Sequence, residues 1–177
     1  MNRTPDRPRL GALALLALAL ALALAPPQTQ ATAEVGKRPP PVELPTVDGS
    51  LLQLERLRGQ VVYLDFWASW CTPCRQSFPW MADMHRRYAA QGLNVVAVNV
   101  DARQADAQGF LKSVPAPFKV AFDPAGKTPR EYAIKAMPTS VLIGRDGRVR
   151  LVHAGFRASD TAALEAAITE ALKEPAP

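Results

Sequence analysis

The feature that most constrains this fold is a pair of cysteines placed where a buried strand passes into a helix. Residues 61–67 form a nearly continuous apolar run, which is typical of a strand covered on both faces. Apolar residues then recur at helical spacing over residues 72–91, and Gly92 ends the pattern. Cys71 and Cys74 stand at this junction. The chain is therefore expected to present two thiols at the N-terminus of a helix.

Two thiols in this position favour redox chemistry. The unpaired N–H groups and the positive end of the helix dipole stabilise a thiolate at Cys71, which can attack a disulfide of another molecule. Cys74 can then resolve the mixed disulfide by closing a Cys71–Cys74 bond. Pro73 fits here because the first helical turn tolerates proline. No other cofactor is expected, because the disulfide itself would carry the electrons.

Other uses of the two cysteines are weaker interpretations. Covalent haem attachment requires a histidine directly after the second cysteine, where this chain has Arg75. A zinc site requires more ligands, and neither His85 nor His153 stands at a ligand spacing from the pair. A purely structural disulfide would close a very small loop and contribute little stability. A metal site and a structural disulfide are thus the alternatives to a redox-active dithiol.

Asp65 is the one polar residue of the apolar run, six residues before Cys71. Burial of a carboxylate is costly without a partner or a function, and it raises the pKa of the group toward neutrality. A carboxylate behind the dithiol could take the proton of Cys74, directly or through a water molecule, during resolution. Asp65 is therefore a candidate catalytic residue. The alternative is a hydrogen-bonded strand residue without a catalytic role.

The remaining pattern predicts an α/β domain with a central mixed sheet flanked by helices. A strand over residues 93–100 follows the first helix, which favours a parallel strand pair with a right-handed crossover. Asp-Gly pairs at residues 48–49 and 146–147 indicate two hairpins, one before the first buried strand and one joining two late strands. The other expected elements are a helix at 105–113, strands at 119–122, 140–143 and 149–153, and a helix at 159–173.

The N-terminal region has the pattern of an export signal. Three arginines precede an unbroken run of Leu, Ala and one Gly over residues 10–25, which is shorter than an ordinary membrane-spanning helix. A small-x-small cleavage motif ends at Ala33. Residues 1–33 are thus expected to be a signal peptide or a signal anchor. The protein would be periplasmic, soluble if the segment is cleaved and otherwise held at the inner membrane by this segment alone.

Residues 34–43 are rich in proline and are expected to form a linker, which leaves residues 44–177 as one domain. The chain carries a net charge of +5, but the first 33 residues hold three of its 21 basic and one of its 16 acidic residues. The remainder therefore has a net charge of about +3, with charges scattered rather than clustered. This pattern excludes nucleic acid as an expected partner.

The combined motifs carry a family resemblance. Segments 65–68, 70–74 and 137–139, which read Asp-Phe-Trp-Ala, Trp-Cys-Thr-Pro-Cys and Met-Pro-Thr, resemble the thioredoxin fold. The first Asp-Gly hairpin, the lead-in at residues 57–60 and the segment between residues 101 and 123 are similar to the extracytoplasmic TlpA/ResA-type thiol–disulfide oxidoreductases. The resemblance implies a thioredoxin fold with an N-terminal β-hairpin extension.

The resemblance also implies a role for each motif residue. Cys71 would be the exposed nucleophile, Cys74 the buried resolving thiol, and Asp65 the counterpart of the buried acid of thioredoxin. Pro138 would be a cis-proline facing Cys71, although an X-Pro pair at the start of a strand can equally be an edge device when taken alone. The implied substrate-binding residues are Trp70, Thr72, Pro73, Met137, Pro138 and Thr139.

At three places the sequence departs from the family pattern, and these departures bear on the acid–base residues and on the specific role of the protein. ResA-like proteins often carry Glu three residues after the second cysteine, where this chain has Ser77. Thioredoxin has a Lys on the strand next to its buried acid, where this chain has Ala97 or Val98. The Gly-x-Pro-Glu-Thr stretch of CcmG-type haem-maturation reductases is also missing from the sequence, which argues against that specific role.

The implied function is a periplasmic thiol–disulfide oxidoreductase that reduces disulfides of exported proteins, such as apocytochrome c or copper-site proteins. Thr-Pro between the cysteines resembles the reducing types more than the strongly oxidising Pro-His type. Electrons would come from a membrane partner with its own cysteine pair. The alternatives are a thiol oxidant, a copper-handling metallochaperone and a thiol peroxidase. A peroxidase needs Thr or Ser three residues before its reactive cysteine, and this chain has Ala68 there.

Overall fold

The computed structural model describes residues 32–176. The signal sequence expected over residues 1–33 lies outside this range except for its last two residues, so its cleavage or anchoring stays a prediction. Within the range 32–176, no helix is both long and apolar enough to span a membrane.

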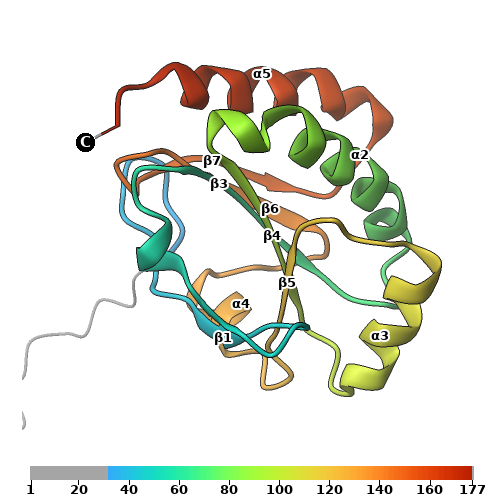
Figure 1. Cartoon of the computed structure of the whole chain (residues 1–177). Helices are drawn as coiled ribbons and strands as arrows, with labels where there is room; N and C mark the ends of the chain where they lie inside the picture. The colour runs from blue at the N-terminus through green and yellow to red at the C-terminus, as the bar shows by residue number, and fades with distance from the viewer. Residues whose placement is uncertain (1–31, 177) are drawn as a thin grey trace, which may run out of the picture. The chain divides into compact units, whose positions relative to one another are not determined.

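A five-stranded mixed sheet forms the centre of the domain, with the strand order β5-β4-β3-β6-β7 (Figure 1). The central strand β3 (Val61–Trp67) runs parallel to β4 (Leu93–Asn99), and β4 runs parallel to β5 (Lys119–Phe122). On the other side, β6 (Thr139–Ile143) is antiparallel to both β3 and β7 (Val149–Ala154). The expected parallel pair and the antiparallel end of the sheet are both confirmed.

Helices cover both faces of this sheet. Helices α2 (Thr72–Tyr88) and α5 (Thr161–Lys173) lie next to each other over one face, and Glu165 on α5 accepts a hydrogen bond from Tyr88 Oη at 2.6 Å (Figure 1). The short helix α4 (Lys127–Glu131) lies on the opposite face. The sheet is thus flanked by helices on both sides, as the alternating strand and helix pattern predicted.

The remaining helical elements are short. Helix α3 (Gln104–Ser113) follows β4 and packs Phe110 into the same apolar cluster as α2. Helix α5 begins two residues later than expected, because a 3-10 turn occupies the residues before it. Over residues 32–176, the 3-10 turns are η1 (Leu54–Leu57), η2 (Ala89–Gln91) and η3 (Ala158–Asp160).

An antiparallel hairpin precedes the central strand. Strands β1 (Glu43–Pro45) and β2 (Leu51–Gln53) pair through a turn that contains Gly49 in the left-handed region, at φ 80°. The hairpin is joined to β5, because the Val47 N–H donates to the Val120 carbonyl oxygen at 2.9 Å. The N-terminal β-hairpin extension expected from the Asp-Gly pair is confirmed.

Residues 34–43, expected to be a Pro-rich linker leading into the domain, lie against the domain. The Gly36 N–H donates to the Val149 carbonyl oxygen at 2.8 Å, and the Tyr132 hydroxyl donates to the Pro40 carbonyl oxygen at 2.8 Å. Val42 is only 3% exposed. Prolines favour an extended backbone, but an extended backbone can still lie on a surface when its carbonyl oxygens and one apolar side chain find partners there.

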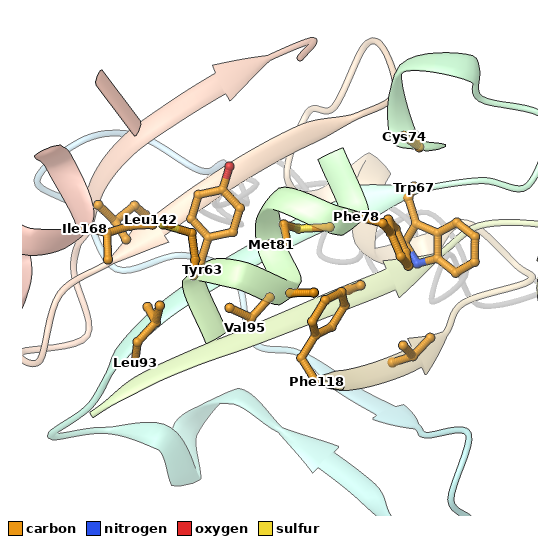
Figure 2. Packing of buried hydrophobic residues seen from close by; sticks show 14 of the residues in the cluster. Tyr63, Trp67, Cys74, Phe78, Met81, Leu93, Val95, Phe118, Leu142 and Ile168 are labelled. Atoms are coloured by element: carbon orange, nitrogen blue, oxygen red, sulfur yellow. The ribbon is translucent and has the colours of Figure 1, made fainter. Parts of the chain in front are cut away.

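The side chains of β3 alternate between two apolar clusters, because successive residues of a strand point to opposite faces. Tyr63 and Trp67 point into the cluster beneath α2 and α5, whereas Leu64 and Phe66 point into the cluster on the opposite face. Figure 2 shows the first cluster, in which Cys74 lies at the Trp67 end. All seven residues of β3 are buried, so the strand that leads into the dithiol is covered on both faces.

Removal of the Tyr132 hydroxyl tests whether the packing of residues 34–43 stabilises the folded domain. Tyr132→Phe is expected to lower the free energy of unfolding by about 1–2 kcal/mol, because a buried carbonyl oxygen at Pro40 loses its donor. Urea unfolding followed by circular dichroism measures the change. Tyr88→Phe is the control. We expect a smaller loss of stability there, because Tyr88 Oη donates to the Glu165 carboxylate, which is partly exposed and can bind water instead. Equal stability of Tyr132→Phe and wild type would contradict a stabilising contact between Tyr132 and this segment.

Candidate active site

The two cysteines form a disulfide at the first turn of α2. Cys71 is the N-cap residue, and the Cys71–Cys74 bond joins Cα atoms 5.3 Å apart. The Cys74 N–H donates to the Cys71 Sγ at 3.2 Å. A negative charge on this sulfur after reduction would be stabilised by the same N–H group and by the helix dipole. The local geometry therefore favours a thiolate at Cys71.

The surroundings of the two cysteines are unequal. Cys74 is fully buried, whereas Cys71 keeps 4% of its surface exposed. Trp70 stands beside them and is 70% exposed, and Thr72 and Pro73 are exposed as well. An incoming sulfur can therefore reach the edge of Cys71, while Cys74 is accessible only to Cys71 itself. Three of the six expected substrate-binding residues thus form an exposed rim at the dithiol.

The Met137–Pro138 loop lies at the same edge of the sheet. The peptide bond between these residues is cis, as the resemblance implied. Thr139 pairs with Phe66 in the β3–β6 register, so the loop before it lies beside the residues that lead from β3 to Cys71. Met137 is half-buried, and Pro138 is buried. This loop and the dithiol, far apart in sequence, are brought to one edge by the antiparallel pairing of β6 with β3.

Thr139 differs from the other expected substrate-binding residues. Its side chain is buried, and its hydroxyl donates to the Ala136 carbonyl oxygen at 2.7 Å. The hydroxyl is thus used within its own loop and shapes the backbone rather than facing a substrate.

Asp65 lies in the middle of β3 and is fully buried. By the alternation of the strand it points to the same face as Tyr63 and Trp67, toward the cluster that contains Cys74. Oδ1 accepts a hydrogen bond from Ser140 Oγ at 2.7 Å, while Oδ2 has no partner among the described residues. Burial raises the pKa of this carboxyl to about 7, and the hydrogen bond from Ser140 partly offsets the rise.

The β3–β4 register places Ala97 directly beside Asp65. The strand on that side therefore offers the carboxylate no charged partner, in agreement with the position of Ala97 in the sequence comparison with thioredoxin. Ser77, which stands where ResA-like proteins often have Glu, is buried and donates its hydroxyl to the Cys74 carbonyl oxygen at 3.1 Å. Within residues 32–176, Asp65 is thus the fully buried acid on the face that holds Cys74.

A polar network that the sequence analysis did not single out fixes the loop before Cys71. The Asp101 carboxylate accepts hydrogen bonds from the Ser69 backbone N–H and hydroxyl and from Asn99 Nδ2, all within 3.2 Å. Asp101 is only 5% exposed. The position of Asp101 just after β4 was an available signal, because the carboxyl ends of parallel strands meet at one edge of the sheet.

Arg75 ties the start of α2 to α3. Its guanidinium lies 4.7 Å from the centre of the Phe110 ring and donates to Ser113 Oγ at 3.2 Å. Phe110 in turn packs against Trp67 and Phe78, with ring centres 4.7 Å and 5.0 Å away. The helix that carries the cysteines is therefore held from the side as well as from the sheet.

This geometry defines a class of protein. A disulfide at the N-terminus of the helix that follows the central strand, beside a cis-proline loop and above a buried carboxyl, characterises thioredoxin-fold dithiol proteins. Such a site can exchange disulfides, because one sulfur is accessible and the other can resolve the mixed disulfide. No cluster of three or more potential metal-ligating His, Cys, Asp or Glu residues occurs within the described part of the chain.

Residues 34–168 match the Redoxin family, and the chain belongs to that family. The thiol-disulfide oxidoreductase ResA of Bacillus subtilis (strain 168) is 34% identical over 120 residues, which cover 68% of this chain and 67% of the relative. A crystal structure of a putative thiol:disulfide interchange protein DsbE from Chlorobium tepidum is 55% identical, with a TM-score of 0.77, and the match covers 80% of this chain and 99% of that chain.

A third match is the pneumococcal exposed lipoprotein thioredoxin from Streptococcus pneumoniae, which is 28% identical with a TM-score of 0.65. That match covers 74% of this chain and 99% of the other. Together with the cysteine pair, these relatives establish the chain as a TlpA/ResA-type thiol–disulfide oxidoreductase.

The raised pKa of Asp65 predicts a specific dependence of stability on pH. The folded protein keeps the Asp65 proton up to pH about 7, whereas the unfolded chain releases it near pH 3.8. The free energy of unfolding therefore falls as the pH rises between these values, by about 4 kcal/mol at most. The side chain of Asp65→Asn does not ionise, so the free energy of unfolding of this variant does not fall in this way. The variant should therefore be more stable than the wild type at pH 8, and its advantage over the wild type should be smallest at pH 3.5.

Urea unfolding of both oxidised proteins between pH 3.5 and 8.5 measures this difference. The comparison isolates Asp65, because every other titrating group is shared by the two proteins. Parallel stability curves over the whole range would contradict a neutral buried carboxyl.

Proposed function

We propose that this protein is an exported reductase, in which Cys71 and Cys74 pass two electrons to disulfides of other exported proteins. The observation that carries the proposal is the unequal setting of the two sulfurs, with Cys71 at the helix N-terminus beside the exposed Trp70 and Cys74 fully buried. A protein disulfide can approach the first sulfur and never meets the second. This arrangement favours attack on a disulfide by Cys71 and resolution by Cys74.

The proposed reaction has two displacement steps. The Cys71 thiolate attacks one sulfur of the client disulfide, which breaks the client S–S bond and forms a mixed disulfide. Cys74 then loses its proton to Asp65 Oδ2 and attacks the Cys71 Sγ. The Cys71–Cys74 bond forms, the bond to the client breaks, and the client leaves as a dithiol after taking up protons. Asp65 returns its proton to solvent before the next cycle.

The direction of electron flow is argued from the residues near the sulfurs. Thr72 and Pro73 separate the cysteines, and within residues 32–176 the single hydrogen-bond donor to the Cys71 Sγ is the Cys74 N–H. A strongly oxidising protein needs a much more stabilised thiolate, with a thiol pKa near 3.5. The described residues place no basic side chain in hydrogen-bond contact with the Cys71 sulfur, since Arg75 turns to Phe110 and Ser113. These features support reduction of clients rather than their oxidation.

The proposed compartment is the periplasm. The leader pattern of residues 1–33 supports export, and the resemblance to an exposed lipoprotein thioredoxin agrees with it. The proposed clients are exported proteins whose cysteines must be free to bind a group, such as apocytochrome c or copper-site proteins. In an oxidising compartment the site needs a supply of electrons, which we assign to a membrane protein with its own cysteine pair.

The midpoint potential of the Cys71–Cys74 pair tests the proposed direction. Full-length protein equilibrated in defined thiol redox buffers should show a value near about −250 mV or lower, in the range of thioredoxin. The fraction of disulfide is followed by trapping free thiols and measuring mass. A value near about −120 mV would make the protein an oxidant and reverse the proposed direction.

Trapping distinguishes the roles of the two sulfurs. Cys74→Ser should accumulate a stable mixed disulfide with an oxidised Cys-x-x-Cys-His peptide, because the resolving thiol is gone. Cys71→Ser should trap none, because Cys74 is buried. Non-reducing mass spectrometry detects the adducts, and an oxidised peptide without the histidine is the control for client preference. Equal trapping by both variants would contradict the assignment, and peroxide turnover by the wild type would favour a peroxidase.

A further inference from the structure

A row of side chains crosses the sheet at the level of Asp65. The β3–β4 register places Ala97 on one side of it, and the β3–β6 register places Ser140 on the other. His153 on β7 pairs with Ser140 in turn, and its Nε2 lies 3.3 Å from Asp160 Oδ2. Directly opposed residues share one face of a sheet, so the whole row lies on the face covered by α2 and α5.

The two oxygens of the Asp65 carboxyl have different surroundings in this row. Ser140 Oγ lies 2.7 Å from Oδ1, and both residues are buried. Oδ2 is buried and has no hydrogen-bond partner among the described residues. A buried polar atom without a partner is costly, and such atoms concentrate at functional sites. The hydrogen bond therefore makes the two oxygens different: Oδ1 is fixed by Ser140, and Oδ2 is free to accept a proton.

We propose that Ser140 is the positioning residue of the proton-transfer step: its hydroxyl holds Oδ1 of Asp65, so that Oδ2 is the atom that takes the proton of Cys74. The inference rests on the proposed function of Asp65 as proton acceptor and deepens it. In the step itself, the Cys74 S–H bond breaks, an Oδ2–H bond forms, and the sulfur attacks the Cys71 Sγ. Ser140 keeps its own proton throughout and exchanges no electrons.

The neutral hydroxyl also sets how strongly Asp65 binds its proton. A hydrogen bond to a carboxylate stabilises the charged form, and it opposes the effect of burial on the pKa of Asp65. Ala97 cannot supply a second donor from β4. Among the described residues, the ionisable groups on this face include Tyr63 on β3, Cys71 and Cys74, and His85 and Tyr88 on α2. Glu165 on α5 and the His153–Asp160 pair at β7 and the start of α5 also lie on this face. The Tyr63 pKa is raised by burial first and by the charge of Asp65 second, and a hydrogen bond with Ser140 opposes the rise only partly, so Tyr63 stays neutral.

The test follows the resolution step directly. Reduced full-length protein is mixed with dithiobis-nitrobenzoate, which places a thionitrobenzoate group on Cys71, and the attack of Cys74 then releases this coloured group. Stopped-flow absorbance between pH 5.5 and 9 gives the rate. In wild type the rate should rise with a midpoint near the Asp65 pKa of about 7. In Ser140→Ala the midpoint should move up by about one pH unit, because the carboxylate loses a charge-assisted donor.

This shift makes Ser140→Ala about fivefold slower than wild type at pH 7 and equal to it at pH 9. Ser140→Thr keeps the hydroxyl and should restore the wild-type midpoint. Thr128→Val, which removes a buried hydroxyl on α4 at the opposite face of the sheet, is the matched control and should leave the profile unchanged. A rate that falls by the same factor at every pH would indicate a purely structural effect and overturn the proposal.

A double variant separates the two hypotheses. If Ser140 acts through Asp65, Ser140→Ala should have no further effect on the rate in an Asp65→Asn background. If Asp65→Asn alone keeps the wild-type profile, the proton-accepting role of Asp65 fails. If Asp65→Asn flattens the profile but Ser140→Ala matches wild type, the role of Asp65 stands and that of Ser140 fails. Titration of the Asp65 carboxyl carbon by NMR in the oxidised proteins gives the same answer without turnover.

Discussion

The structure depends on the complete burial of β3, the strand that leads into the dithiol. Both faces of this seven-residue strand must be covered, and this requires α2 and α5 on one side and the hairpin with residues 34–43 on the other. Close packing on both faces leaves the end of the strand no freedom to move. Cys71 is therefore presented from a rigid support, and the Asp101–Ser69 network fixes the last few residues before it.

The chemistry follows from the different positions that β3 and α2 give to the two sulfurs. The helix begins at the point where the strand leaves the core, so Cys71 caps the helix at the edge while Cys74 returns into the apolar cluster. One sulfur receives the favourable field of the helix N-terminus, and the other is shielded from every partner except the first. A single turn of helix thus separates the accessible sulfur of Cys71 from the fully buried sulfur of Cys74.

The buried carboxyl shows a conflict between stability and function. An apolar side chain at position 65 would remove the cost of desolvation, yet the strand keeps an acid whose pKa is raised to about 7 by burial. A single neutral hydroxyl from Ser140 moderates this cost without cancelling it. A charged partner would hold the carboxylate ionised, and a group held ionised takes up a proton less readily at neutral pH. The moderate partner therefore suits the proton-accepting role that we propose for Asp65.

The sequence by itself determined the buried strand, the helix that follows it and the two cysteines at their junction, because these features depend on local periodicity and spacing. The family resemblance added the prediction of a cis peptide bond before Pro138. Only the tertiary structure decided that residues 34–43 pack on the domain and that Ser140 meets Asp65, since the Tyr132–Pro40 and Ser140–Asp65 contacts join residues 92 and 75 positions apart. The Ser140–Asp65 contact is set by the β3–β6 strand register, and the Tyr132–Pro40 contact by the packing of residues 34–43 on the domain. Both are decided by how whole faces pack rather than by local spacing.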